Sequence, residues 1–125
     1  NGIPKTAEGR FEIAKRIVDR AEAVGIDRND VYIDCLTLTV SAEQAACRQT
    51  LEALHRVKTE LGCKTCLGVS NILFGLPNRE LVNRSFFTMA MEQGLDLPII
   101  NPNVESMTGA VREFCVLNGI DKYSF

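Results

Sequence analysis

The amino-acid sequence predicts an α/β protein with three parallel strands in the order α-βα-βα-βα. Short apolar runs alternate with longer segments whose apolar residues recur at helical spacing, a pattern typical of parallel strands joined by crossover helices. The runs end on Asp34, Asn71 and Asn101, so 37 and then 30 residues separate successive strand ends. A (β/α)8 barrel uses about 31 residues per unit, and a doubly wound sheet has much the same period. Because three strands cannot close a barrel, the barrel interpretation makes this sequence the C-terminal part of one.

Each expected element has a local signal at its start or its end. Helices are expected over residues 8–24, 41–61, 79–93 and 105–117, and strands over residues 31–34, 64–71 and 97–101. Thr6 is the expected N-cap of the first helix, and Ser41 with Gln44 forms a capping box before the second. A glycine follows each helix, at positions 25, 62, 94 and 119, and is its expected stop. Residues 35–40 are expected to form a loop that passes over the strand ends.

Apolar residues at helical spacing are expected to face the core of the protein. They include Ile17 and Val24 in the first helix, Leu81 and Met89 in the third, and Leu117 in the last. With 46% hydrophobic residues, the chain of 125 residues is long enough to bury a core of this kind. The N-terminus lacks an initiator Met, so we expect a piece of a longer protein.

Charge and composition exclude several classes of function. A net charge of −2 gives no support to nucleic-acid binding, and no apolar run approaches the roughly 20 residues of a membrane span. The N-terminus has no signal-peptide pattern, and five cysteines form an odd set, so we expect reduced thiols in a cytoplasmic protein. Only Cys63 and Cys66 have a paired spacing, and His55 is the single histidine. We therefore expect no metal site and treat the cysteines as small hydrophobic residues.

The polar residues at the three strand ends are the candidate site. The carboxyl ends of parallel strands meet at one edge of a sheet, so Asp34, Ser70, Asn71 and Asn101 are expected to lie together. An Asp accepts two adjacent N–H donors, and an Asn both donates and accepts, a combination suited to a polar heterocycle. Each residue is also a common helix cap or turn former, and this structural alternative stays open at each position.

Longer stretches around these residues resemble a known family. Gly68-Val-Ser-Asn71, followed by Phe74-Gly-Leu-Pro-Asn-Arg79, resembles the pterin-binding methyltransferases that act with corrinoids. These include the folate domain of cobalamin-dependent methionine synthase. The similarity continues through residues 81–91 and 94–102, and upstream through residues 32–40 and 2–6. The resemblance implies that residues 1–125 form one partial domain, the C-terminal part of a (β/α)8 TIM barrel from the helix after strand five onward.

The resemblance also implies a function and roles for individual residues. The longer protein would bind 5-methyltetrahydrofolate and transfer its N5-methyl group to cobalt(I) of a cobalamin or other corrinoid, carried by a partner protein or domain. Asp34 would bind the pterin, and Asn71 would be catalytic, donating a hydrogen bond to N5. Gly68 and Ser70 would shape the strand end. Arg79 would contact the folate tail or support the loop, and Asn101 would be a further substrate-binding residue.

Two alternatives remain open from the sequence. Dihydropteroate synthases share the fold and the pterin, but they place a Lys after a strand-end Ser or Gly, and an Arg and a His on the last strand. Here Asn71 and Ile72 follow Ser70, and Pro102 and Asn103 follow Asn101, without cations for diphosphate chemistry. The family's site also uses an Asp and an Asn from earlier strands, which this sequence does not include. An inactive folate-binding or interaction fragment is therefore the second alternative, and its exposed sheet edge predicts a homo-oligomer.

Overall fold

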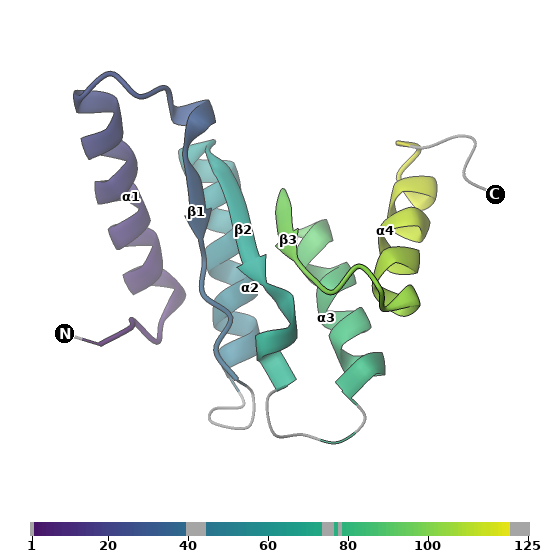
Figure 1. Ribbon diagram of the computed structural model, residues 1–125. Coiled ribbons are helices and arrows are strands. Elements are labelled where there is room, and N and C mark those ends of the chain that lie inside the picture. The colour runs from purple at the N-terminus through teal and green to yellow at the C-terminus, as the bar shows by residue number, and fades with distance from the viewer. Residues whose placement is uncertain (1, 40–44, 74–76, 78, 121–125) are drawn as a thin grey trace.

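Three parallel strands form one sheet in the order β1-β2-β3 (Figure 1). The computed structural model describes residues 2–39, 45–73, 77 and 79–120. The strands are β1 (Tyr32–Asp34), β2 (Lys64–Gly68) and β3 (Leu97–Ile99), and the α-helices are α1 (Ala7–Ala23), α2 (Ala46–Arg56), α3 (Arg79–Glu92) and α4 (Glu105–Leu117). The predicted fold class, a partial (β/α)8 barrel with the order α-βα-βα-βα, is confirmed.

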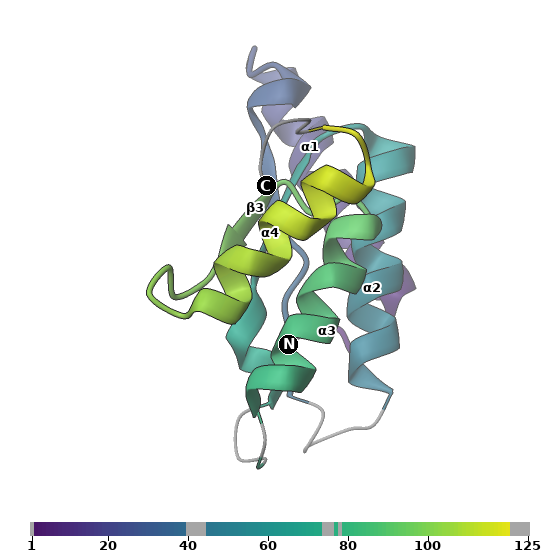
Figure 2. The same ribbon diagram turned by 90° about the vertical axis from the view of Figure 1, so that its right-hand side faces the viewer.

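The helices cover one face of the sheet and leave the other face open. Helices α2 and α3 lie on the same side of the strands in both views (Figures 1 and 2). Ile33 and Leu67 point toward them and are buried, together with Phe87 of α3. On the opposite face, Tyr32 and Ile99 are 53% and 60% exposed. In a complete barrel this face lines the interior. The expected self-association of the chain stays a prediction.

Strand β2 ends earlier than the sequence predicts. The expected strand ran to Asn71, but β2 stops at Gly68 and a 3₁₀ helix, η3, follows over Val69–Leu73. Val69 and Ile72 are three residues apart and almost fully buried, so both point into the core from one face of the 3₁₀ turn. Ser70 and Asn71 therefore belong to this turn, directly after the strand. Strand β3 likewise ends at Ile99, before Asn101.

The predicted signals at the helix ends are largely confirmed. The Thr6 hydroxyl accepts a hydrogen bond from the Gly9 amide at 3.1 Å and caps α1. The α-helical part of α2 ends at Arg56 and continues as one π-helical turn, Val57–Leu61. Gly62 then ends the segment with a φ of 68°, as predicted. The proposed capping box at positions 41 and 44 lies outside the described residues.

Several apolar residues that were expected to face the core are exposed. They are Ile17, Val24, Leu81, Val82, Met89 and Leu117. In α1, α3 and α4 the apolar stripe predicted from the sequence is wider than the strip that is buried. The buried members of the predicted stripes include Val18 in α1 and Phe86 in α3.

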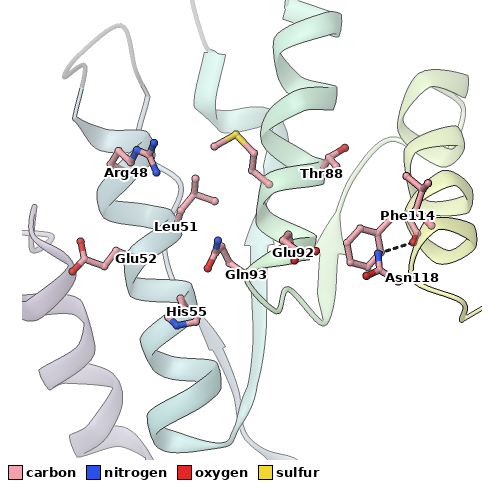
Figure 3. A pocket seen from close by; sticks show the side chains of 11 residues that line it. Arg48, Leu51, Glu52, His55, Thr88, Glu92, Gln93, Phe114 and Asn118 are labelled. Atoms are coloured by element: carbon pink, nitrogen blue, oxygen red, sulfur yellow. Dashed lines mark hydrogen bonds between the residues drawn. The ribbon is translucent and has the colours of Figure 1, made fainter.

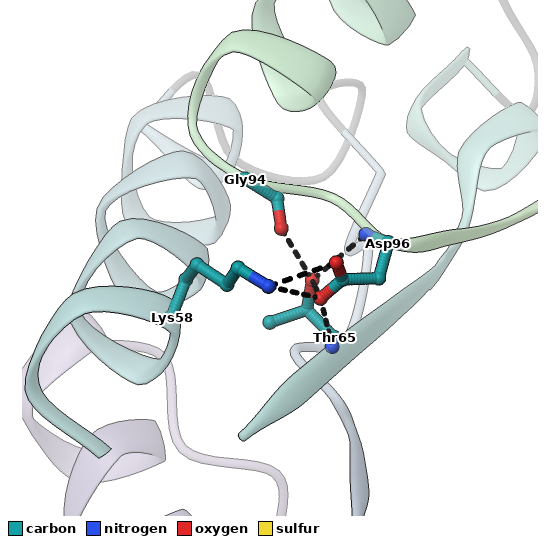
Figure 4. Close-up of polar contacts among 4 residues, drawn as sticks. All are labelled: Lys58, Thr65, Gly94 and Asp96. Carbon is teal, nitrogen blue, oxygen red and sulfur yellow. Dashed lines mark hydrogen bonds and ion pairs between the residues drawn. The ribbon is translucent and has the colours of Figure 1, made fainter. Parts of the chain in front are cut away.

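A polar network joins the amino ends of β2 and β3 (Figure 4). The Lys58 ammonium group donates to both carboxylate oxygens of Asp96, at 2.8 and 2.9 Å. The same carboxylate accepts from the Thr65 amide at 3.0 Å, and the Thr65 hydroxyl donates to the Gly94 carbonyl at 2.8 Å. This end of the sheet is opposite the predicted site, and in parallel barrels it serves stability.

Candidate functional site

A cavity of about 620 Å³ opens at the carboxyl ends of the three strands. Five of the six predicted site residues line it: Asp34, Gly68, Ser70, Asn71 and Asn101. The sixth, Arg79, is the exposed first residue of α3 and is not among the lining residues. The volume lies within the range of roughly 300–1,000 Å³ that is typical of small-molecule sites.

Asp34 is the last residue of β1, and its exposed side chain forms a local turn. Its Oδ1 atom accepts a hydrogen bond from the Leu36 amide at 2.8 Å. Its Oδ2 atom receives no hydrogen bond from the described part of the chain. One carboxylate oxygen therefore shapes the turn, as the structural alternative predicted, and the binding role of Asp34 stays a prediction.

Asn71 lies over the end of β2, and Gly68 provides the space for it. A Cβ atom at position 68 would stand 3.0 Å from Asn71 Nδ2 and 3.6 Å from its Cγ. The buried neighbours Val69 and Ile72 hold the turn, so Asn71 itself is exposed. Within the described residues the Asn71 side-chain amide has no hydrogen-bond partner, and its role toward a ligand stays a prediction.

Asn101 has a structural role at the edge of the cavity. Its side-chain Oδ1 accepts from the Asn103 amide at 3.0 Å, which forms the turn between β3 and α4. The amide nitrogen of the same side chain keeps its donors for other partners. Asn101 is thus a turn former that also lines the cavity.

The sequence did not single out the residues of the loop after Asp34. Residues 35–39 have no regular structure, as predicted, and position 40 lies outside the described residues. Leu36, Thr37 and Leu38 line the cavity from this loop. The Thr37 hydroxyl is buried without a hydrogen-bond partner among the described residues. A threonine in a loop carries no sequence signal that would distinguish it.

The cysteines near the site are weakly reactive. Burial raises the pKa of the Cys35 thiol to about 12, and the neighbouring Asp34 carboxylate adds to the shift. Burial also raises the pKa of Cys63 and Cys66. These thiols stay protonated at neutral pH, so they lack the thiolate that redox or nucleophilic chemistry requires. No three His, Cys, Asp or Glu residues in the described ranges form a group that could hold a metal ion.

Two larger hollows lie on the helices, away from the strand ends. One of about 720 Å³ lies between α2, α3 and α4, and its polar side chains are spread along the three helices (Figure 3). In this hollow, Asn118 donates to the carbonyl of Phe114 in its own helix at 2.9 Å. The other, of about 760 Å³, is formed by α3 and α4. Neither brings polar groups from several strand ends together, as the smaller cavity does.

The fold and the cavity define a class of protein. Parallel strands with helices on one face, and a polar cavity at the carboxyl ends of the strands, are the arrangement of a barrel-type α/β protein with a small-molecule site. No helix within the described ranges has the length and apolar character that crossing a membrane requires.

Comparisons with known proteins identify the family within this class. A family model described as "Pterin binding enzyme" matches residues 5–101. The methylcorrinoid:tetrahydrofolate methyltransferase of Eubacterium limosum is 31% identical over 124 residues, which cover 97% of this chain and 45% of that protein. The methionine synthases of Mycobacterium leprae and Mycobacterium tuberculosis are each 35% identical over 108 residues, or 80% of this chain and 9% of each enzyme.

The chain therefore belongs to the pterin-binding enzyme family, and the predicted resemblance to its methyltransferase members is confirmed. It spans less than half the length of these relatives.

Proposed function

We propose that the protein containing this chain binds 5-methyltetrahydrofolate in the strand-end cavity and catalyses methyl transfer between its N5 atom and the cobalt of a corrinoid. The observation that carries the proposal is the position of Asn71. Its side-chain amide has no partner among the described residues, and it lines the same cavity as the Asp34 carboxylate. The names of the relatives, which include tetrahydrofolate and methylcorrinoid, support the same pair of substrates.

The groups that line this cavity are suited to binding a pterin ring. Its amino-pyrimidinone edge presents adjacent N–H donors, and the Asp34 carboxylate oxygen not used by Leu36 is a suitable acceptor. Thr37 adds a hydroxyl, and Leu38 and Ile100 add apolar walls. A flat ring between apolar walls, held at its edge by a few polar groups, is a common way to bind a heterocycle.

Asn71 is proposed to assist the departure of the methyl group. When the methyl group leaves, the C–N bond breaks and its electron pair stays on N5, which becomes more basic and takes up a proton from solvent to give tetrahydrofolate. A hydrogen bond from the Asn71 amide to N5 strengthens as this charge develops, so it stabilises the transition state more than the ground state. A corrinoid on a partner protein or domain supplies the cobalt(I) nucleophile.

The same residue serves transfer in either direction. The printed name of the Eubacterium limosum relative describes transfer from a methylcorrinoid to tetrahydrofolate. Both directions pass through one transition state, so a hydrogen bond that stabilises it accelerates both. We propose the direction from 5-methyltetrahydrofolate to cobalt(I), as in methionine synthesis.

Dihydropteroate synthesis is the weaker candidate. Phosphate-ester chemistry requires cations beside the leaving group. The described residues that line the cavity include no Lys or Arg. We therefore prefer methyl transfer to diphosphate displacement.

The test uses the full-length protein, with 5-methyltetrahydrofolate and free cob(I)alamin, and follows the absorbance of the cobalt centre. We expect saturable methyl transfer, and Asp34→Asn should weaken folate binding roughly tenfold or more while the rate at saturation changes little. A lower rate with unchanged affinity would contradict the role of Asp34. Absence of both folate binding and transfer would leave the inactive-fragment alternative standing, and titration calorimetry on the isolated chain tests that alternative directly.

A further inference from the structure

The loop after β1 contains an unusual backbone conformation at Leu36. Its φ is 62°, and among the described residues it is the one non-glycine residue with a positive φ. A leucine rarely adopts this left-handed conformation, because its Cβ atom crowds the following carbonyl oxygen. Such a conformation persists only where the surrounding structure holds it. Leu36 lines the cavity and donates its amide to Asp34, so whatever holds it acts on the site.

Arg10 of α1 holds this turn from behind the cavity. Its side chain is almost completely buried, and it is not among the cavity-lining residues. The Nη1 atom donates to the Cys35 carbonyl at 3.2 Å and to the Leu36 carbonyl at 3.0 Å. It also lies 2.9 Å from the Thr50 hydroxyl, which in turn donates to the Leu36 carbonyl at 3.1 Å. Arginine and threonine from two helices therefore converge on two successive carbonyls.

The peptide unit between Cys35 and Leu36 connects Arg10 to Asp34. In a trans peptide the carbonyl and the amide point in opposite directions. Arg10 binds the Cys35 carbonyl on one side of this unit, and the Leu36 amide donates to Asp34 Oδ1 at 2.8 Å on the other. The orientation of this peptide plane therefore sets the direction in which the Asp34 carboxylate is held.

We propose that Arg10 is a positioning residue for ligand binding: it acts through the Cys35–Leu36 peptide unit to orient the Asp34 carboxylate toward the pterin. This inference rests on the proposed function. An arginine suits the role because its planar guanidinium is permanently charged and directs several N–H groups at fixed angles, which a lysine does not. A further donation, from Nε to the Pro4 carbonyl at 2.9 Å, locks the guanidinium in place.

We expect the loss of Arg10 to weaken folate binding without changing the rate of methyl transfer at saturating folate. In Arg10→Met the left-handed turn loses its main support, so fewer molecules hold Asp34 in the binding geometry. Apparent affinity falls by the same factor as the competent fraction, and we expect folate to bind roughly tenfold more weakly. The rate at saturating folate should stay within about twofold of wild type, because Asn71 lies on η3, a different element.

A double-mutant cycle with Leu36→Asn distinguishes positioning from general destabilisation. Asparagine adopts positive φ far more readily than leucine, so it depends less on Arg10. In the full-length protein, Arg10→Met should cost about tenfold in folate affinity with Leu36 present, and less than about threefold in the Leu36→Asn background. Equal losses in the two backgrounds, or a lower melting temperature with unchanged affinity, would overturn the proposal.

Arg28→Met is the matched control. Arg28 also donates to a backbone carbonyl, that of Leu61 at 2.8 Å, but at the opposite end of the sheet. We expect it to lower stability without changing folate affinity. If Arg10→Met fails to fold, Thr50→Val removes the other donor to the Leu36 carbonyl with little change in shape, and roughly threefold weaker binding is expected. Unchanged affinity in Thr50→Val would then count against the proposal.

A readout without folate separates this inference from the proposed function. Hydrogen exchange over residues 35–39 should be about tenfold faster in Arg10→Met than in wild type, and unchanged in Arg28→Met. If the wild-type protein does not bind folate, the proposed function fails, and the role of Arg10 in holding Asp34 is decided by this exchange measurement. Equal exchange in wild type and Arg10→Met would refute that role.

Discussion

The close approach of Asn71 to Gly68 permits a sharp test of the catalytic proposal. Gly68→Ala would place a Cβ atom 3.0 Å from Asn71 Nδ2, where carbon contacts of about 3.5 Å or more are usual. The backbone of the turn resists a shift, because Val69 and Ile72 are anchored in the core. The Asn71 side chain must therefore move by about half an ångström, away from the position that the glycine allows.

The size of the effect follows from this displacement. A misplacement of about 1 Å at a catalytic group costs roughly a hundredfold in rate, so about half that distance should cost around tenfold, or about 1.4 kcal/mol in the barrier. Position 68 is a strand residue outside the left-handed region, so alanine is tolerated by the backbone there. Stability should be unchanged or higher by up to about 1 kcal/mol.

The assay compares methyl transfer at saturating folate with the urea midpoint for four proteins: wild type, Gly68→Ala, Asn71→Ala and the double variant. Asn71→Ala alone should lower the rate by roughly one to three decades, as loss of a transition-state donor does. The double variant should be no slower than Asn71→Ala, because the added methyl group acts only through Asn71. A tenfold loss on top of Asn71→Ala, or full activity in Gly68→Ala, would refute the reasoning.

Two further predictions concern stability. Asp96→Ala removes two hydrogen bonds from Lys58 and one from the Thr65 amide, and should lower the free energy of unfolding by about 2 kcal/mol without affecting methyl transfer. Lys15→Met breaks an exposed pair and should cost much less stability than Asp96→Ala in the same urea titration; equal losses would contradict the importance of the network. Burial raises the pKa of Cys35 from its ordinary 9.0 to about 12. The folded state therefore keeps this thiol protonated while the unfolded state ionises, so its stabilisation is complete below about pH 9 and is lost as the pH rises toward 12. Between pH 7.5 and pH 10 this thiol should lower the free energy of unfolding of the wild type by roughly 1 kcal/mol, and Cys35→Ala should lack this contribution; identical pH dependence in the two proteins would exclude this assignment.

Much of the candidate site could be predicted because it depends on chain order. Residues that follow parallel strands meet at one edge of the sheet whatever the details of packing. Asp34, Gly68, Ser70, Asn71 and Asn101 line one cavity for this reason. Arg79 was expected there as well, from the resemblance alone, and its place at the start of α3 keeps it out of the lining.

What the sequence by itself determined is local: the alternation of apolar patterns, the Thr6 cap, and the glycine at position 62 that ends a helical segment with positive φ. These depend on a few neighbouring residues and their backbone preferences. Only the tertiary structure decided where β2 ends and how Leu36 is held, because both depend on contacts between distant parts of the chain. Val69 and Ile72 turn into a core built by the helices, and Arg10 reaches the Leu36 carbonyl across 26 residues. No local preference of a leucine predicts a left-handed turn. The turn at Leu36 is held by the buried guanidinium of Arg10, which comes from helix α1.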